Sequence, residues 1–214
     1  MTENLTLTSL PLFPLGTVLY PGGYLPLRIF EVRYLDMIGK CHKAGAPFGV
    51  VSLTEGSDVA RPGPGGFATE AFNAVGTLAT ITELTSPQAG LLVIKCTGAQ
   101  RFQINRREKL KHGLWIADVS RMPDDQTIAV PDDLKPVATS LAKLIQTLHE
   151  RAVASDQMPL QPPYQLDDCA WVSNRWCELL PMPSELKQRM MALDNPLVRL
   201  ELVSDMLERA GIAL

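Results

Sequence analysis

The sequence is short of the residues and motifs on which catalytic and metal sites are usually built. Its 214 residues include three histidines and four cysteines, none at HxxH or CxxC spacing. A GxSxG nucleophile elbow and a GxxxxGK(S/T) phosphate loop are both absent. Cys41 and His42 are adjacent, but neighbours on a helix point about 100° apart and do not form a nucleophile–base pair. We therefore expect a protein that is not an enzyme and that binds no metal or other cofactor.

Charge is absent from residues 4–27, a stretch long enough to span a bilayer. The stretch is interrupted by prolines at 11, 14, 21 and 26 and by glycines at 16, 22 and 23. Such a segment does not keep its backbone hydrogen-bonded in lipid. The only charge before it is Glu3, whereas a signal peptide begins with basic residues. We expect a cytoplasmic protein that makes no membrane contact.

Neither composition nor net charge points to a special class of partner. The apolar content of 46% and charged content of 20% are typical of a globular protein. The formal net charge of -3 gives no basis for strong attraction to nucleic acid or anionic lipid. The four cysteines have apolar neighbours and are expected to be buried free thiols in a reducing compartment: Cys41, Cys96, Cys169 and Cys177.

Up to about residue 122, the pattern is one of short strands separated by glycine and proline. One helix is expected, over Glu31–Ala44, and Gly45 is expected to end it. About seven strands are expected, over Ser9–Leu15, Tyr24–Phe30, Phe48–Leu53, Ala71–Leu84, Leu91–Thr97, Arg101–Lys111 and Leu114–Arg121. Many short strands with glycine-marked turns favour a barrel-like or sandwich arrangement.

After about residue 132 the pattern becomes helical. Apolar residues fall on one helical face over residues 134–152. Asp167 is expected to cap a second helix that ends near Leu180, and Ser184 a third over Glu185–Leu193. Asn195 and the proline after it predict the start of a fourth helix, which Gly211 is expected to end. We therefore divide the chain into a β subdomain, 1–125, and a helical subdomain, 126–214.

The stretch PLFPLGTVLYPGGYLPLRIFEVRYLDM, from Pro11 to Met37, resembles the opening of the substrate-recognition domain at the N-terminus of Lon proteases. Further segments resemble that family in the same order: FGVV at 48–51, VGTLATI at 75–81, TGAQRFQI at 97–104, WIADV at 115–119 and the helical stretch 186–207. The resemblance covers about residues 9–210. It implies an α+β fold, in which a PUA-like β pseudo-barrel with one helix precedes a helical subdomain of about four helices.

The resemblance also implies a function. In Lon-like proteases this domain precedes an ATPase and a Ser-Lys protease domain, and no segment of the 214 residues resembles either. We therefore expect a free-standing member of the family. Its partners would be other proteins or unfolded peptide segments, with a connection to proteolysis or quality control.

The candidate peptide-binding residues are Arg28, Arg33, Tyr34, Phe67 and Trp171. Arg28, Arg33 and Tyr34 surround Glu31 in the densest polar group of the chain, where an exposed arginine and aromatic ring would hold a peptide. The interpretation favoured for this group is structural: Glu31 pairs with the arginines at a strand–helix junction, and Tyr34 packs beneath. The RPGPGG loop at 61–66 is interpreted as a mobile loop beside a groove. Trp171 is a candidate for a hydrophobic groove, although helix-core packing is the commoner role of such residues.

The alternative function is RNA binding, because PUA-like folds include RNA binders. A basic run follows the fifth strand, with Phe102 and Trp115 nearby for base stacking: Arg101, Arg106, Arg107, Lys109 and Lys111. Glu108 interrupts this run and the whole chain is acidic. A solvated strand face is therefore the favoured interpretation of the run, and nucleic acid is an unlikely partner.

Overall fold

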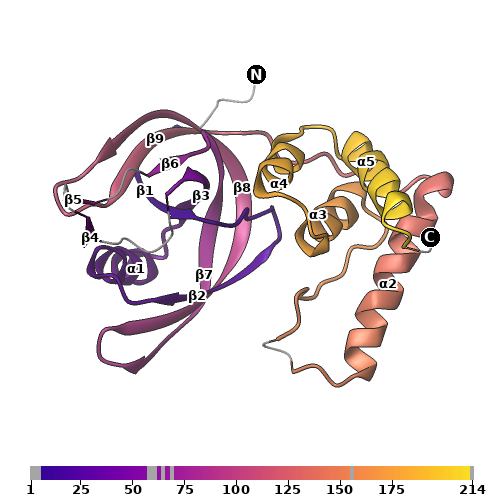
Figure 1. Ribbon diagram of the computed structural model, residues 1–214, viewed down its shortest axis with the longest axis horizontal. Helices are drawn as coiled ribbons and strands as arrows, with labels where there is room; N and C mark the ends of the chain where they lie inside the picture. Colours follow the sequence, from indigo (N-terminus) through magenta and orange to yellow (C-terminus); the bar gives the residue numbers. More distant parts are fainter. Residues whose placement is uncertain (1–5, 57–61, 64–65, 68–69, 155–156, 213–214) are drawn as a thin grey trace. The chain divides into compact units, whose positions relative to one another are not determined.

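The chain divides into two compact units where the strand-rich pattern ends, Met1–Asp124 and Asp125–Leu214, in the computed structural model (Figure 1). The structure describes residues 6–56, 62–63, 66–67, 70–154 and 157–212. The α+β class is confirmed, with strands and one helix in the first unit and helices in the second.

The strands of the first unit pair in a closed ring (Figure 1). The ring runs through β1 (Thr6–Leu15), β9 (Trp115–Arg121), β8 (Leu91–Lys109), β7 (Val75–Gln88) and β3 (Phe48–Glu55). A parallel pairing of β1 with β3 closes it, and its other pairings are antiparallel. Register shifts interrupt three of those pairings, so the sheet is not a regular barrel.

Shorter strands extend the ring at its edges. β2 (Tyr24–Ile29) pairs with the first half of β8, and β6 (Ala71–Phe72) pairs with β3. β4 (Pro62–Gly63) and β5 (Gly66–Phe67) form a separate two-stranded ribbon. Helix α1 (Val32–Ala44) packs Met37, Ile38 and Cys41 into the core formed by the strands. It ends at Gly45, whose φ of 60° is the left-handed conformation that favours glycine, as predicted.

Two predicted strands are one in the structure. We expected a break between Thr97 and Arg101, but β8 continues from Leu91 to Lys109. Its neighbour on one edge changes from β2 to β9, and β7 accompanies it on the other. Gly98 is required because a Cβ atom there would lie 2.1 Å from the carbonyl oxygen of Tyr20. The glycine permits a close backbone approach and does not end the strand.

The second unit contains the four expected helices, α2 (Lys135–Glu150), α3 (Cys169–Leu179), α4 (Ser184–Ala192) and α5 (Pro196–Arg209), after a 3-10 turn over Asp132–Leu134. Asn195 caps α5 as predicted, since its Oδ1 accepts hydrogen bonds from the backbone N–H groups of Leu197 and Val198. Two other predicted caps were wrong. Asp168, one residue after Asp167, caps α3, while Pro183 precedes α4 without a side-chain cap. Among the described residues, no helix combines the length and apolar character needed to cross a membrane.

A buried arginine connects the parts of this second unit. Arg199 of α5 has no exposed surface, and its Nη1 and Nη2 atoms lie 2.8 and 3.1 Å from the two carboxylate oxygens of Asp125. It also donates to Asn174 of α3 and to the carbonyl oxygens of Met190 and Leu193. A guanidinium with this many acceptors satisfies its donors in the interior and fixes α5 against α3 and α4.

Gly98→Ala is expected to lower the free energy of unfolding by about 3 kcal/mol, because its new Cβ meets backbone that does not rotate away. Gly39→Ala is the matched control. Gly39 lies within α1 with no atom within 4 Å of the added methyl, so the change should stabilise by up to about 1 kcal/mol. Urea unfolding followed by circular dichroism measures both, and equal stability of the two variants would contradict the close approach.

Candidate functional site

A pocket of about 180 Å³ opens where β2 passes into α1. We call it the β2–α1 pocket. Most of its lining is apolar and comes from β1, β2 and α1: Phe13, Leu15, Leu27, Arg28, Ile29, Phe30, Glu31 and Tyr34. Small-molecule sites usually measure about 300–1,000 Å³, so this pocket has the size for one large side chain of a partner.

Two large apolar side chains are exposed beside the pocket. Phe30 is 54% exposed and Val32, the first residue of α1, is 81% exposed. In the described part of the chain, Val198 and Leu202 of α5 are the other large hydrophobic residues with comparable exposure. An isolated exposed hydrophobic residue needs no explanation, but an exposed aromatic residue in the lining of an apolar pocket is typical of a binding surface.

The segment that carries Phe30 and Val32 is held by Arg33, which is buried. The guanidinium of Arg33 donates to three acceptors: Glu31 at 3.1 Å, Glu70 at 3.0 Å and the carbonyl oxygen of Gly113 at 2.8 Å. It also lies 4.5 Å from the centre of the Tyr34 ring, which in turn stacks on Phe13. These contacts hold the start of α1 against Glu70, against the backbone at Gly113 and against the ring of Phe13.

Glu70 is the acceptor at the centre of this network. One of its carboxylate oxygens binds Arg33, while the other lies 2.8 Å from the indole nitrogen of Trp115 and 3.1 Å from Nζ of Lys109. Burial alone would raise the pKa of Glu70, but hydrogen bonds from Arg33, Trp115 and Lys109 outweigh it and hold the pKa below its usual range. Glu70 is therefore a charged structural group, not a proton donor.

The structure separates the predicted binding residues. Arg28 is exposed and lines the β2–α1 pocket. Tyr34 lines the same pocket but is only 2% exposed, and Arg33 is 6% exposed. Arg33 pairs with Glu31 and Tyr34 is buried, as the structural interpretation predicts, but Arg28 makes no ion pair with Glu31, so that part of the interpretation was wrong. A role of these residues in peptide binding stays a prediction.

The other two predicted residues lie elsewhere. The side chain of Phe67 and residues 61, 64 and 65 of the RPGPGG loop lie outside the described part of the chain. Trp171 belongs to α3 in the second unit, where it is partly buried between Tyr164 and Arg175.

Sequence reasoning missed Phe30, the exposed aromatic residue of the pocket. The signal was available in the alternation of β2. Leu25, Leu27 and Ile29 face the core, so Pro26, Arg28 and Phe30 fall on the opposite face. Glu70 was also missed, because nothing near it in sequence marks it as the partner of Arg33.

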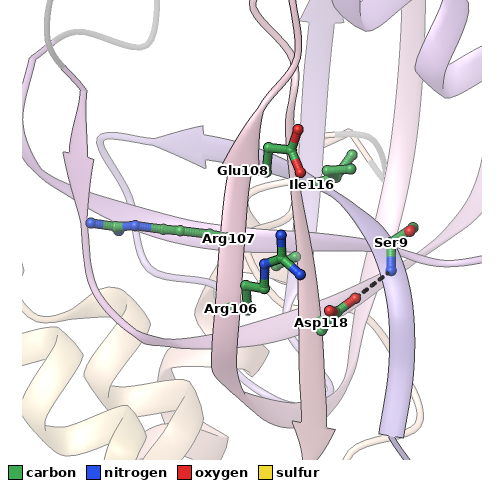
Figure 2. Close-up of a pocket in the computed structure, with 7 residues that line it drawn as sticks. Ser9, Arg106, Arg107, Glu108, Ile116 and Asp118 are labelled. Carbon is green, nitrogen blue, oxygen red and sulfur yellow. Dashed lines mark hydrogen bonds between the residues drawn. The ribbon is translucent and has the colours of Figure 1, made fainter.

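A second, polar pocket of about 130 Å³ lies where β1, β8 and β9 meet (Figure 2). It is lined by Ser9, Arg106, Arg107, Glu108, Ile116, Ala117 and Asp118. Ser9 has a φ of 54° at a register shift of β1, and its N–H donates to the Asp118 carboxylate at 3.1 Å. Figure 2 shows the side chain of Arg106 between Glu108 and Asp118, with Arg107 directed away. The carboxylates on either side of Arg106 oppose the binding of an anion.

The basic run proposed for RNA does not form one surface. Arg101 is buried and donates to the carbonyl oxygen of Pro123. Arg107 lies over the rings of Phe72 and Trp115, and Lys109 pairs with Glu70. These contacts engage three of the five cations of the run within the fold, so the run does not present a continuous basic face.

The second unit contains a wider groove, of about 610 Å³, along α2. Small and apolar side chains line most of it: Ala129, Val130, Ala138, Thr139, Ala142 and Leu166, with Lys135 and Asp167. Elsewhere in the second unit, Glu178 has a perturbed pKa. Burial raises the pKa of Glu178 to about 7, against the opposing effects of Arg175 and Lys187. Glu178 lines none of these three pockets, so its perturbed pKa does not indicate a catalytic site.

Potential metal ligands are dispersed in the described residues, where no three His, Cys, Asp or Glu side chains lie together as a metal site requires. The four cysteines are free and buried. Burial raises the pKa of Cys41, and it raises that of Cys96 to about 12, which keeps both thiols protonated and poorly reactive.

Comparison with known families shows that residues 9–209 match the family described as the ATP-dependent protease La (LON) substrate-binding domain. A search of curated proteins found no match.

Two solved structures are similar to this chain. The chain is similar to a Lon N-terminal domain protein from Xanthomonas campestris, with 30% identity, a TM-score of 0.71, and coverage of 93% of this chain and 98% of that one. It is also similar to the N-terminal domain of the Lon protease from the Mycobacterium avium complex, with a TM-score of 0.56 and coverage of 92% and 96%. The identity with that domain is 15%, so this second likeness concerns the fold alone.

Glu70→Gln is expected to lower the free energy of unfolding by about 3 kcal/mol at pH 7, because it removes a buried charge from beside Arg33 and Lys109. The folded-state pKa of Glu70 is lowered, so its contribution is complete above the unfolded pKa of about 4.3 and is lost as pH falls through the folded pKa. The difference in free energy of unfolding between wild type and Glu70→Gln should therefore become smaller at acidic pH. Urea unfolding at neutral and acidic pH measures it.

Glu83→Gln is the control for this experiment. It breaks an ion pair with Lys95 at the surface, where Glu83 is 60% exposed, and should change stability by less than about 1 kcal/mol. A deficit in Glu70→Gln that equals the control, or that does not change with pH, would contradict the assigned role of Glu70.

Proposed function

Because this chain belongs to the family of LON substrate-binding domains, we propose that it is a non-catalytic module that recognises exposed apolar segments of other proteins at the β2–α1 pocket. The observation that carries the proposal is the exposure of Phe30, which belongs to the apolar lining of the pocket, together with that of Val32 two positions further along the chain. Unfolded or partly folded proteins expose the apolar side chains that such a surface binds.

The way this surface is held supports the proposal. Exposed apolar residues on a flexible loop lose conformational entropy when they bind, and this loss weakens affinity. Phe30 and Val32 are instead flanked by β2 and α1, and Arg33 connects that junction to Glu31, Glu70 and Gly113. The surface is therefore arranged for binding before a partner arrives.

We extend the proposal to proteolysis. The matched family is described as the substrate-binding domain of an ATP-dependent protease. A module of this kind acts by holding a segment that a separate protease then degrades.

The combined change Phe30→Ser and Val32→Ser tests the surface. It removes most of the apolar contact area at the rim, so binding should weaken roughly tenfold. The probe is a permanently unfolded protein, reduced and carboxyamidomethylated lysozyme, and fluorescence anisotropy measures its binding. Stability should not change, because both side chains are exposed.

The matched control is Val198→Ser with Leu202→Ser, which removes the exposed apolar pair of α5, 38% and 40% exposed. It should leave binding of the unfolded protein unchanged. Unchanged affinity in the Phe30 and Val32 variant would refute the proposed site, and an equal loss in both variants would show that the binding is not specific to the pocket.

A further inference from the structure

We infer that the β2–α1 pocket selects segments in which an aspartate or glutamate lies within about two positions of a large apolar residue, and that Arg28 makes this selection. The inference rests on the proposed function, since it names the class of segment that the same pocket takes. It is carried by the charge of the pocket rim, by the chemistry of the β2 edge and by the size of the pocket.

Arg28 is the unbalanced charge of the rim. The partly buried network next to it is balanced: Arg33 pairs with Glu31 and Glu70, and Lys109 pairs with Glu70. Arg28 lines the pocket and is exposed, and its side chain makes no hydrogen bond or ion pair with any described residue. A guanidinium in this state is available to pair with a carboxylate of the bound segment.

Recognition through side chains is favoured over addition of a strand to β2. The N–H of Gly98 donates to the carbonyl oxygen of Gly23, and hydrogen-bonding residues alternate along an antiparallel pair. The backbone N–H and C=O groups of Leu25, Leu27 and Ile29 therefore point toward β8. The backbone of Pro26 points the other way, toward the open edge of β2. Proline has no N–H to donate, so it removes the central donor that an added strand would use.

The size of the pocket sets the spacing of the recognised residues. A volume of about 180 Å³ holds one large side chain, such as leucine or phenylalanine. In an extended segment, successive residues are spaced by about 3.3 Å. Because Arg28 is part of the lining, the carboxylate that reaches it lies within about two positions of the apolar residue.

The net charge of the chain distinguishes a local effect of Arg28 from general electrostatic attraction. At -3, the whole protein repels an acidic peptide. A preference for acidic peptides therefore does not follow from overall charge, and requires a local cation at the place of binding.

The experiment uses the full chain and three fluorescein-labelled peptides, Gly-Ser-Glu-Leu-Glu-Ser-Gly and its forms with glutamine or lysine in place of both glutamates. At low ionic strength, we expect the glutamate peptide to bind roughly threefold to tenfold more tightly than the glutamine peptide, with the lysine peptide weakest. Salt at about 0.5 M should remove most of the difference. Arg28→Glu should reverse the order, so that the lysine peptide binds best.

Arg106→Glu is the matched control. Arg106 is also exposed, lines the polar pocket of Figure 2 and makes no hydrogen bond or ion pair with a described residue, so the variant carries the same net charge as Arg28→Glu. It should keep the wild-type order. Equal binding of the three peptides by the wild type would overturn the inference, as would the same reversal in both variants.

The two proposals fail in different ways. If the peptides bind irrespective of charge and the Phe30 and Val32 variant still weakens that binding, the inference is wrong and the proposed function stands. If no peptide binds and the unfolded protein does not bind either, both are wrong. The side chains of Arg28 and Arg106 are exposed and make no hydrogen bond or ion pair with a described residue, so both charge variants should unfold at the wild-type urea concentration.

Discussion

The first unit depends on one buried ion pair, between Arg33 at the start of α1 and Glu70 before β6. Charges are costly to bury unless they are paired and hydrogen-bonded, and this pair meets both conditions. Trp115 and Lys109 donate hydrogen bonds to the second carboxylate oxygen of Glu70. Arg33 also donates to Glu31 and to the carbonyl oxygen of Gly113. The pair therefore connects α1, β8 and β9, and any movement of the β2–α1 junction would break several hydrogen bonds together.

In this arrangement the buried charges stabilise the fold, and exposed apolar groups lie beside them. In many enzymes, perturbed ionisable groups converge in a cleft to carry out proton transfer. Here the lowered pKa of Glu70 comes from partners that hold the fold, and the surface beside it is apolar. The recognition surface that we propose needs a stable shape more than reactive groups, and the network stabilises the segment that carries it.

The second unit uses the same physical solution. Arg199 is fully buried, and its bidentate pair with Asp125 is surrounded by an amide and backbone carbonyl groups. Each unit thus has one arginine that satisfies acceptors from several elements at once. Arginine suits this role because its donors are planar and its charge persists at all ordinary pH values.

Local sequence determined much of this protein. The glycine at 45 ends α1, Asn195 begins α5, and the order of strands and helices follows from periodicity, because each of these features depends on neighbours within a few residues. The candidate site followed in part, since Arg28 and Tyr34 belong to the opening motif and line the pocket. Tertiary structure decided the rest. The break expected between Thr97 and Arg101 does not occur, because Gly98 allows a close approach of the Tyr20 carbonyl, and Arg33 pairs with Glu70, 37 residues away. The opening motif therefore determined the family and the fold, whereas long-range contacts decided which of its residues hold the structure and which reach solvent.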